Sequence, residues 1–247
     1  MIKFFRQLRQ NLIESGKTTK YLKYAIGEIV LVVLGILIAL QINNWNEQNK
    51  INAKRAVYMQ SLQNDLNVDV KELKLRISNI KIQYNNDEDE RNKLSGAQIT
   101  KDSVVARVKR LNIYLETYAE FNNNTFNSLI SSGEIDLLGP ELKNELFTLH
   151  KMQEKAKQSY NIHFDKYLDN YLNFSSKYPV GRFTELVTGP LNDYLWHHFD
   201  YKEFLVDYNK FMTSRKAALS RNMAYIEPVL IQSEYILEKY LKNDQNY

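Results

Sequence analysis

The longest apolar run of the chain extends from Tyr24 to Ile42, and Glu28 and Gln41 are the two strongly polar positions within it. A helix of this length, rising about 1.5 Å per residue, would span roughly 28 Å, close to the hydrocarbon thickness of a bilayer. The pattern predicts an uncleaved transmembrane helix over residues 24–42. A cleaved signal peptide is the alternative, but the run is long for one and no small-residue cleavage site follows it.

Beyond this run, apolar side chains recur every three or four residues, which is the period of a helix with one buried face. The members of the stripe are Tyr58, Leu62, Leu66, Val70, Leu73, Ile77, Ile80 and Tyr84. Glycine and proline are absent between Ile36 and Ser95. We therefore expect the transmembrane helix to continue without a stop signal into a helical stalk and first bundle helix over residues 43–95. The acidic cluster of residues 87–90 is expected to be a solvated helix end or loop.

Helical periodicity also dominates residues 96–247. One helix should begin at a cap on Thr100 or Asp102 and carry an apolar stripe as far as Tyr118. A short helical turn over residues 126–130 should end at Gly133, a residue suited to a left-handed C-cap.

Two longer helices are expected after these. One should start at Gly139-Pro140, because proline is favoured at the first position of a helix. The other should cover about residues 201–241, with Tyr225 facing inward and Pro228 kinking or restarting it. Residues 175–190 are expected to form a long connection. No segment alternates as a strand would, so the predicted class is all-α. The predicted architecture is a transmembrane helix, a stalk and an extracytoplasmic helical bundle, with residues 96–247 forming the remainder of that bundle.

Charge gives the membrane segment an orientation. Residues 1–23 carry six basic side chains against one acid, Glu14, and the positive-inside rule places such a flank in the cytoplasm. We expect residues 1–23 to be a cytoplasmic basic amphipathic segment with a short helix on the inner leaflet, whose apolar positions are Ile2, Phe5, Leu8 and Leu12. Gly16 and the polar residues around it would separate this helix from the span, and a disordered basic tail is the alternative. Tyr24 and Trp45 are expected to act as interfacial anchors at the two ends of the run. The basic side chains expected at the lipid surface are Lys3, Arg6, Arg9, Lys20 and Lys23.

Composition argues against several kinds of function. The chain has no cysteine, which excludes disulfides, thiolate catalysis and cysteine metal sites. The net charge of +4 comes from the first 23 residues and does not indicate nucleic-acid binding. His150 and His163 lack the spacing of metal ligands, and no catalytic motif is present. We expect a protein that is not an enzyme and has no metal and no cofactor. Its 17 tyrosines and 11 phenylalanines should fill a core, with the lining of a ligand groove as the alternative.

Two segments resemble a known family. Residues 24–46, YAIGEIVLVVLGILIALQINNWN, resemble the signature of uncharacterised single-pass membrane proteins common in Bacteroidota, and residues 129–135, LISSGEI, resemble the second recurring block of that family. The resemblance implies an inner-membrane location with a helical bundle in the periplasm. It implies no mechanism and no catalytic residue, because the family carries a domain of unknown function.

One face of the apolar run is a candidate for helix packing. On a helical projection Glu28, Gly35 and Ala39 lie within an arc of about 40°, with Glu28 about 20° from each of the other two, and Gly35 and Ala39 form a small-xxx-small pair. We expect this face to pack against another transmembrane helix, with Glu28 bonded across the contact. The alternative is an isolated span whose Glu28 reaches the inner interface.

These observations favour a membrane-anchored scaffold or complex subunit that acts by protein–protein association. Its expected partners are membrane lipid and either a second copy or another membrane protein. A sensory, ligand-binding bundle that signals through a separate protein is one alternative. The other is an accessory subunit of an envelope transport complex, in which Glu28 would be a proton-linked group.

Overall fold

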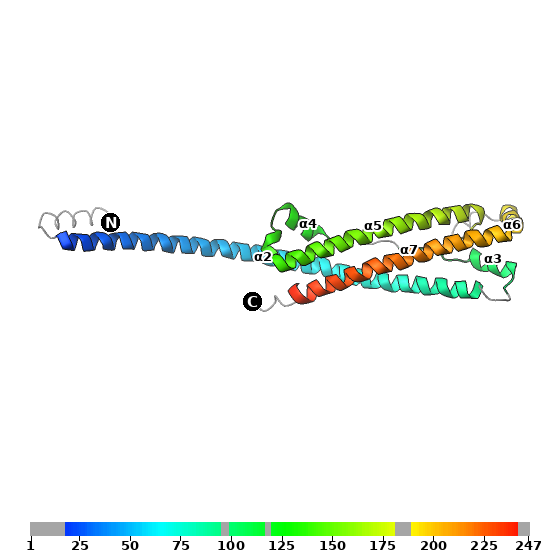
Figure 1. Ribbon diagram of the computed structural model, residues 1–247, viewed down its shortest axis with the longest axis horizontal. Coiled ribbons are helices and arrows are strands. Elements are labelled where there is room, and N and C mark those ends of the chain that lie inside the picture. The colour runs from blue at the N-terminus through cyan, green and yellow to red at the C-terminus, as the bar shows by residue number, and fades with distance from the viewer. Residues whose placement is uncertain (1–17, 95–98, 117–119, 181–188, 242–247) are drawn as a thin grey trace. The chain divides into compact units, whose positions relative to one another are not determined.

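The computed structural model describes residues 18–94, 99–116, 120–180 and 189–241 (Figure 1). The expectation of a basic amphipathic segment, with Lys3, Arg6 and Arg9, falls mainly on residues 1–17, outside the described residues. The regular elements are α2 (Thr18–Leu94), α3 (Lys101–Lys109), α4 (Asn124–Ser131), the 3-10 turn η1 (Ile135–Leu138), α5 (Pro140–Lys177), α6 (Pro190–His197), α7 (Tyr201–Ile236) and the π-helical turn η3 (Leu237–Leu241). The described ranges contain no strand, which confirms the all-α class.

The chain divides into two compact units, residues 1–57 and residues 58–247. Helix α2 contributes to both, because it extends from Thr18 to Leu94. In the first unit its apolar side chains are exposed on every side. The second unit, hereafter the helical unit, contains the later part of α2 and all the other elements.

In the helical unit, α7 packs antiparallel to both α2 and α5. Against α2, Lys74 pairs with Glu234 at 2.7 Å and Lys81 with Glu227 at 3.0 Å, so residue numbers rise along α2 as they fall along α7. Against α5, Lys177 pairs with Glu203 at 2.7 Å. Figure 1 shows α5 and α7 running side by side.

The predicted stripe of α2 faces this packing. Its buried members are Leu62, Leu66, Leu73, Ile77 and Ile80, and Ile80 is fully buried. Removing such aliphatic side chains from water is the main force that holds the later part of α2 in the unit.

Aromatic rings fill the space between α5 and α7. Phe174 stacks on Phe211 with ring centroids 5.3 Å apart, and Tyr167 and Tyr171 contact Phe211 at 5.8 and 5.9 Å. Rings at these separations and tilts combine area burial with favourable quadrupole contacts. The prediction for Tyr225 was wrong, since its side chain is exposed.

Helix α3 begins as predicted but ends early. Thr100 caps it, with its Oγ1 accepting a hydrogen bond from the backbone N–H of Ser103 at 3.2 Å. The helix was expected to carry its stripe to Tyr118, yet it ends at Lys109 and residues 111–116 are not helical. Side chains of other elements bond the backbone of residues 113–116, replacing the bonds that a helix would supply.

Two aspartates of α2 bond the start of helix α4, where Asp65 caps the helix from the side and Asp69 holds the residue that precedes its N-cap. Asp65 accepts hydrogen bonds from the backbone N–H of Thr125 at 3.2 Å and from its hydroxyl at 2.6 Å. Asp69 accepts from the backbone N–H and the side-chain amide of Asn122 at 3.0 and 2.6 Å. Asn123, the residue before the helix, makes no capping bond with its own side chain. The first N–H groups of a helix need such acceptors, and negative charge suits that end of the helix.

The far end of α4 closes in a Schellman motif. Gly133 has φ of +70°, as predicted for a left-handed cap. Its N–H bonds the carbonyl of Ile130 at 3.2 Å, and the N–H of Glu134 bonds the carbonyl of Leu129 at 2.9 Å. These two bonds satisfy carbonyls that the end of the helix leaves open.

The later helices agree with most of what the sequence predicts. Helix α5 starts at Pro140 as predicted and ends at Lys177, and α6 begins at Pro190, the last residue of the expected connection over residues 175–190. The short helix α6 itself was not predicted. Helix α7 does not restart at Pro228, because it is continuous from Tyr201 to Ile236 with this proline inside it.

Replacing Gly133 tests the Schellman motif. Nothing lies within 4 Å of a Cβ added there, so the cost of Gly133→Ala is conformational. We expect a loss of about 1 kcal/mol in the free energy of unfolding, and a smaller loss for Gly133→Asn, because asparagine tolerates the left-handed region. The measurement is chemical denaturation of the full chain in detergent, followed by the fluorescence of buried Trp196 in a Trp45→Phe background. An alanine variant as stable as the parent would contradict the assignment.

Candidate functional site

The apolar part of α2 presents large hydrophobic side chains that no described residue covers. Leu31 is 70% exposed and Ile29 is 63% exposed, while Tyr24 and Trp45, at the two ends, are also exposed. Within the described residues, α2 is the helix that is long and apolar enough to be a candidate membrane span. An uncovered apolar surface of this length is unfavourable in water and favourable in lipid.

The proposed packing face belongs to this surface. Gly35 and Ala39 lie one turn apart on α2, and no atom lies within 4 Å of a Cβ placed on Gly35. Glu28 lies on the same side two turns earlier and is half-buried. The side chain of Lys20, expected at the lipid surface, is outside the described part, and that of Lys23 is exposed.

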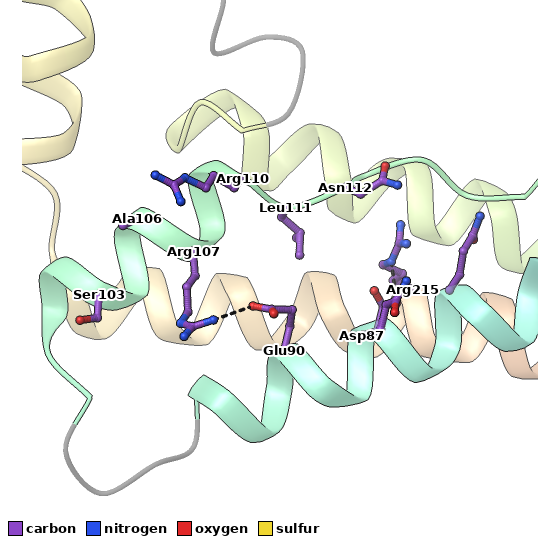
Figure 2. A pocket seen from close by; sticks show the side chains of 11 residues that line it. Asp87, Glu90, Ser103, Ala106, Arg107, Arg110, Leu111, Asn112 and Arg215 are labelled. Carbon is purple, nitrogen blue, oxygen red and sulfur yellow. Dashed lines mark hydrogen bonds and ion pairs between the residues drawn. The ribbon is translucent and has the colours of Figure 1, made fainter.

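A polar cavity of about 570 Å³ lies in the helical unit, at the end where α2 stops. Its walls come from α2, from α3, from residues 110–112 and from Arg215 of α7 (Figure 2). Three guanidinium groups line it, those of Arg107, Arg110 and Arg215, together with the carboxylates of Asp87 and Glu90. The wall therefore carries one more positive than negative group.

Arg215 and Asp87 form a buried ion pair on one side of the cavity. The Nε of Arg215 donates to Oδ2 of Asp87 at 2.7 Å, and the two side chains are 2% and 14% exposed. Its Nη1 donates to the backbone carbonyl of Tyr114 at 2.9 Å. Burial raises the pKa of Asp87 above its usual value, although the guanidinium of Arg215 acts in the opposite direction. One side chain of α7 thus holds α2 and the segment 111–116 together.

A second, more exposed ion pair lies across the cavity. Nη1 of Arg107 is 3.3 Å from Oε2 of Glu90, and Figure 2 shows this contact spanning the space between α3 and α2. Glu90 also pairs with Lys93 at 2.8 Å. The hydrogen bonds from Lys93 and then Arg107 hold the pKa of Glu90 below its usual value.

A smaller cavity of about 250 Å³ lies on the other side of Asp87, between α2 and α7. Tyr208 lines it, and among the described residues its buried hydroxyl has no hydrogen-bond partner. Burial, followed by the charge of Asp87, raises the pKa of Tyr208.

The histidines serve packing. His150 stacks on Phe126 with ring centroids 4.8 Å apart, and Nδ1 of His163 bonds the carbonyl of Ser159 at 2.7 Å. Across the described ranges, no group of three or more histidine, aspartate or glutamate side chains is placed to hold a metal ion.

Sequence reasoning missed the Arg215–Asp87 pair. Arg215 lies four residues after Phe211 and three before Ala218, so a cation occupies the buried stripe of α7. A cation in a buried stripe needs an anion nearby, so this position could have predicted a buried carboxylate that pairs with Arg215. The acidic cluster of residues 87–90 lies close to the end of α2 at Leu94, in agreement with the helix end that was expected, but Asp87 is not solvated, because it is buried against Arg215.

Comparison with known protein families gives one match. The family of unknown function DUF6090 matches residues 28–194, which is more than half of the chain. The chain belongs to the DUF6090 family. Comparisons with curated proteins and with solved structures gave no match. The DUF6090 match begins inside the apolar run and includes residues 129–135 and the α2 and α3 walls of the cavity, whereas Arg215 lies beyond it.

Removing one partner of the buried ion pair tests how much the structure depends on it for stability. Arg215→Met leaves the Asp87 carboxylate and the Tyr114 carbonyl without a donor in the core. We expect the free energy of unfolding to fall by about 3–5 kcal/mol. The measurement is the same denaturation of the full chain in detergent.

The matched control is the next residue along α7. Lys216 pairs with Glu88 at 2.7 Å on the surface, so Lys216→Met should change stability little. The double variant Asp87→Leu, Arg215→Met should recover part of the loss, because no charge remains buried. Equal effects of the Arg215 and Lys216 variants would contradict the role of the buried pair.

Proposed function

We propose that this member of the DUF6090 family is a single-pass inner-membrane protein that acts by protein–protein association. Residues 24–42 cross the bilayer once, with the N-terminus in the cytoplasm and residues 58–247 forming a helical bundle in the periplasm. The observation that carries the proposal is the continuous apolar helix whose side chains no described residue covers. The basic excess of residues 1–23 supports the orientation.

Association is proposed to run through the face of Glu28, Gly35 and Ala39. The spacing of Gly35 and Ala39 supports this, because small residues one turn apart let a second helix approach closely. The partner is a second copy of the chain or another single-span helix. The protein then acts as a scaffold or a complex subunit.

The orientation has a direct test. Protease added to intact spheroplasts should degrade the C-terminal part of the chain, because residues 58–247 face outward. A C-terminal epitope followed by immunoblotting gives the readout, and a cytoplasmic protein that stays intact is the control. If the epitope survives in spheroplasts and is lost after lysis, the orientation is reversed.

The packing face can be mapped with single cysteines, since the chain has none of its own. Cysteine at Gly35 or Ala39 should crosslink efficiently in membranes under mild oxidation. Cysteine at Val30 or Leu37, on the opposite side of the helix, should crosslink weakly. Gel mobility without reductant measures the product. Similar crosslinking at all four positions would reject self-association through this face.

A ligand-binding, sensory bundle is the second candidate. The polar cavity of about 570 Å³ favours it, because small-molecule sites have volumes of about 300–1,000 Å³. In that case the bundle would signal through the membrane partner rather than serve as a scaffold alone.

A further inference from the structure

We infer that the cavity between α2 and α3 binds a small solute carrying one carboxylate together with hydroxyl or ammonium donors. The inference does not rest on helix association in the membrane. It rests on the charges in the cavity wall and on how firmly each of them is held.

Arg107 is the group best placed to receive an anion. Its partner Glu90 is shared with Lys93, and the Lys93 contact of 2.8 Å is shorter than the Arg107 contact of 3.3 Å. A ligand carboxylate can therefore replace Glu90 as the partner of the Arg107 guanidinium, while Glu90 remains paired with Lys93. Figure 2 shows Arg107 reaching from α3 across the cavity towards α2.

Arg110, the residue that follows α3, adds a second cation. It lines the cavity and is exposed, and no ion pair joins it to another of the described residues. Its guanidinium is therefore available to a ligand that occupies the cavity, and in the bound state it is the second contact of the carboxylate. Guanidinium and carboxylate form short, charge-assisted and often bidentate bonds.

The opposite wall of the cavity presents hydrogen-bond acceptors, which would bind the hydroxyl or ammonium groups of the ligand. Nε of Arg215 donates to Asp87 and Nη1 donates to the Tyr114 carbonyl, which holds the Asp87 carboxylate at the wall. The side-chain amides of Gln83 and Asn86 lie beside it. The Asp87 carboxylate and the side-chain oxygen of Asn86 are acceptors that favour hydroxyl or ammonium groups on the ligand, because the side-chain oxygen of Gln83 already accepts from Glu116. The two carboxylates of the cavity disfavour a doubly charged phosphate.

The test uses two pairs of probes on the full chain in detergent. Glucuronate is compared with glucose, and serine with serinamide, so that each pair differs in the carboxylate. At about 10 mM we expect at least one carboxylate to raise the melting temperature by about 2 °C or more over its partner without the carboxylate. Inorganic phosphate is tested at the same concentration.

Variants assign the effect to the cavity. Arg107→Gln and Arg110→Gln should each lower the affinity for the active probe about tenfold or more, as expected when a charge-assisted bond is lost. The control is Arg221→Gln, an exposed position of α7 outside the cavity, which should leave the affinity unchanged. The intrinsic melting temperature of each variant provides its own baseline.

Three results would overturn the inference. The first is no stabilisation by either carboxylate over its partner without the carboxylate. The second is stabilisation that persists in the double variant of Arg107 and Arg110, and the third is a larger effect of phosphate than of both carboxylates. The membrane crosslinking pattern is independent of these results, so a failure of the cavity and a failure of the association are distinguishable.

Discussion

A guanidinium group buried in a protein core must find an anion and acceptors for its donors, and this requirement organises the end of the helical unit. Arg215 is almost wholly removed from solvent, and it meets the requirement by bonding Asp87 of α2 and the carbonyl of Tyr114. Its own helix, α7, is thereby fixed to two elements distant in the sequence. Such a pair need not add net stability over an apolar core, because desolvating both charges is costly. It does define which register of α2 against α7 is allowed, because a shift of either helix would leave the charges of Arg215 and Asp87 buried without a partner.

The same logic explains why residues 111–116 are not helical. The hydroxyl of Tyr167 donates to the carbonyl of Ile113, Arg215 donates to that of Tyr114, and the N–H of Glu116 donates to the side chain of Gln83. Local periodicity in this region favours a helix that continues to Tyr118. Three side chains from other elements satisfy the backbone instead, and tertiary bonds of this kind override a weak local preference.

Much of the fold could be predicted from the spacing of residue types along the sequence, and the predictions that failed have a common cause. The buried stripe of α2, the cap at Thr100, the left-handed Gly133 and the start of α5 at Pro140 all depend on neighbouring residues in the sequence. The end of α3, the burial of Asp87 and the continuity of α7 through Pro228 depend on contacts between elements, which spacing does not encode. The candidate cavity was missed for the same reason, because its walls come from residues as far apart as 83 and 215.

The cavity follows from where α3 stops. A helix that continued past Lys109 would carry Leu111 and Leu115 on the same stripe as the buried Val104 and Val108. The chain leaves the helix instead, and Leu115 is buried while Asn112 and Arg110 border open space. The polar side chains of α2 in this region, Gln83 and Asp87 among them, are then engaged in bonds with residues 114–116 and with α7 rather than covered by a helix. The contacts that end α3 therefore also leave a hollow with charged walls, which an apolar interface between two helices would not contain.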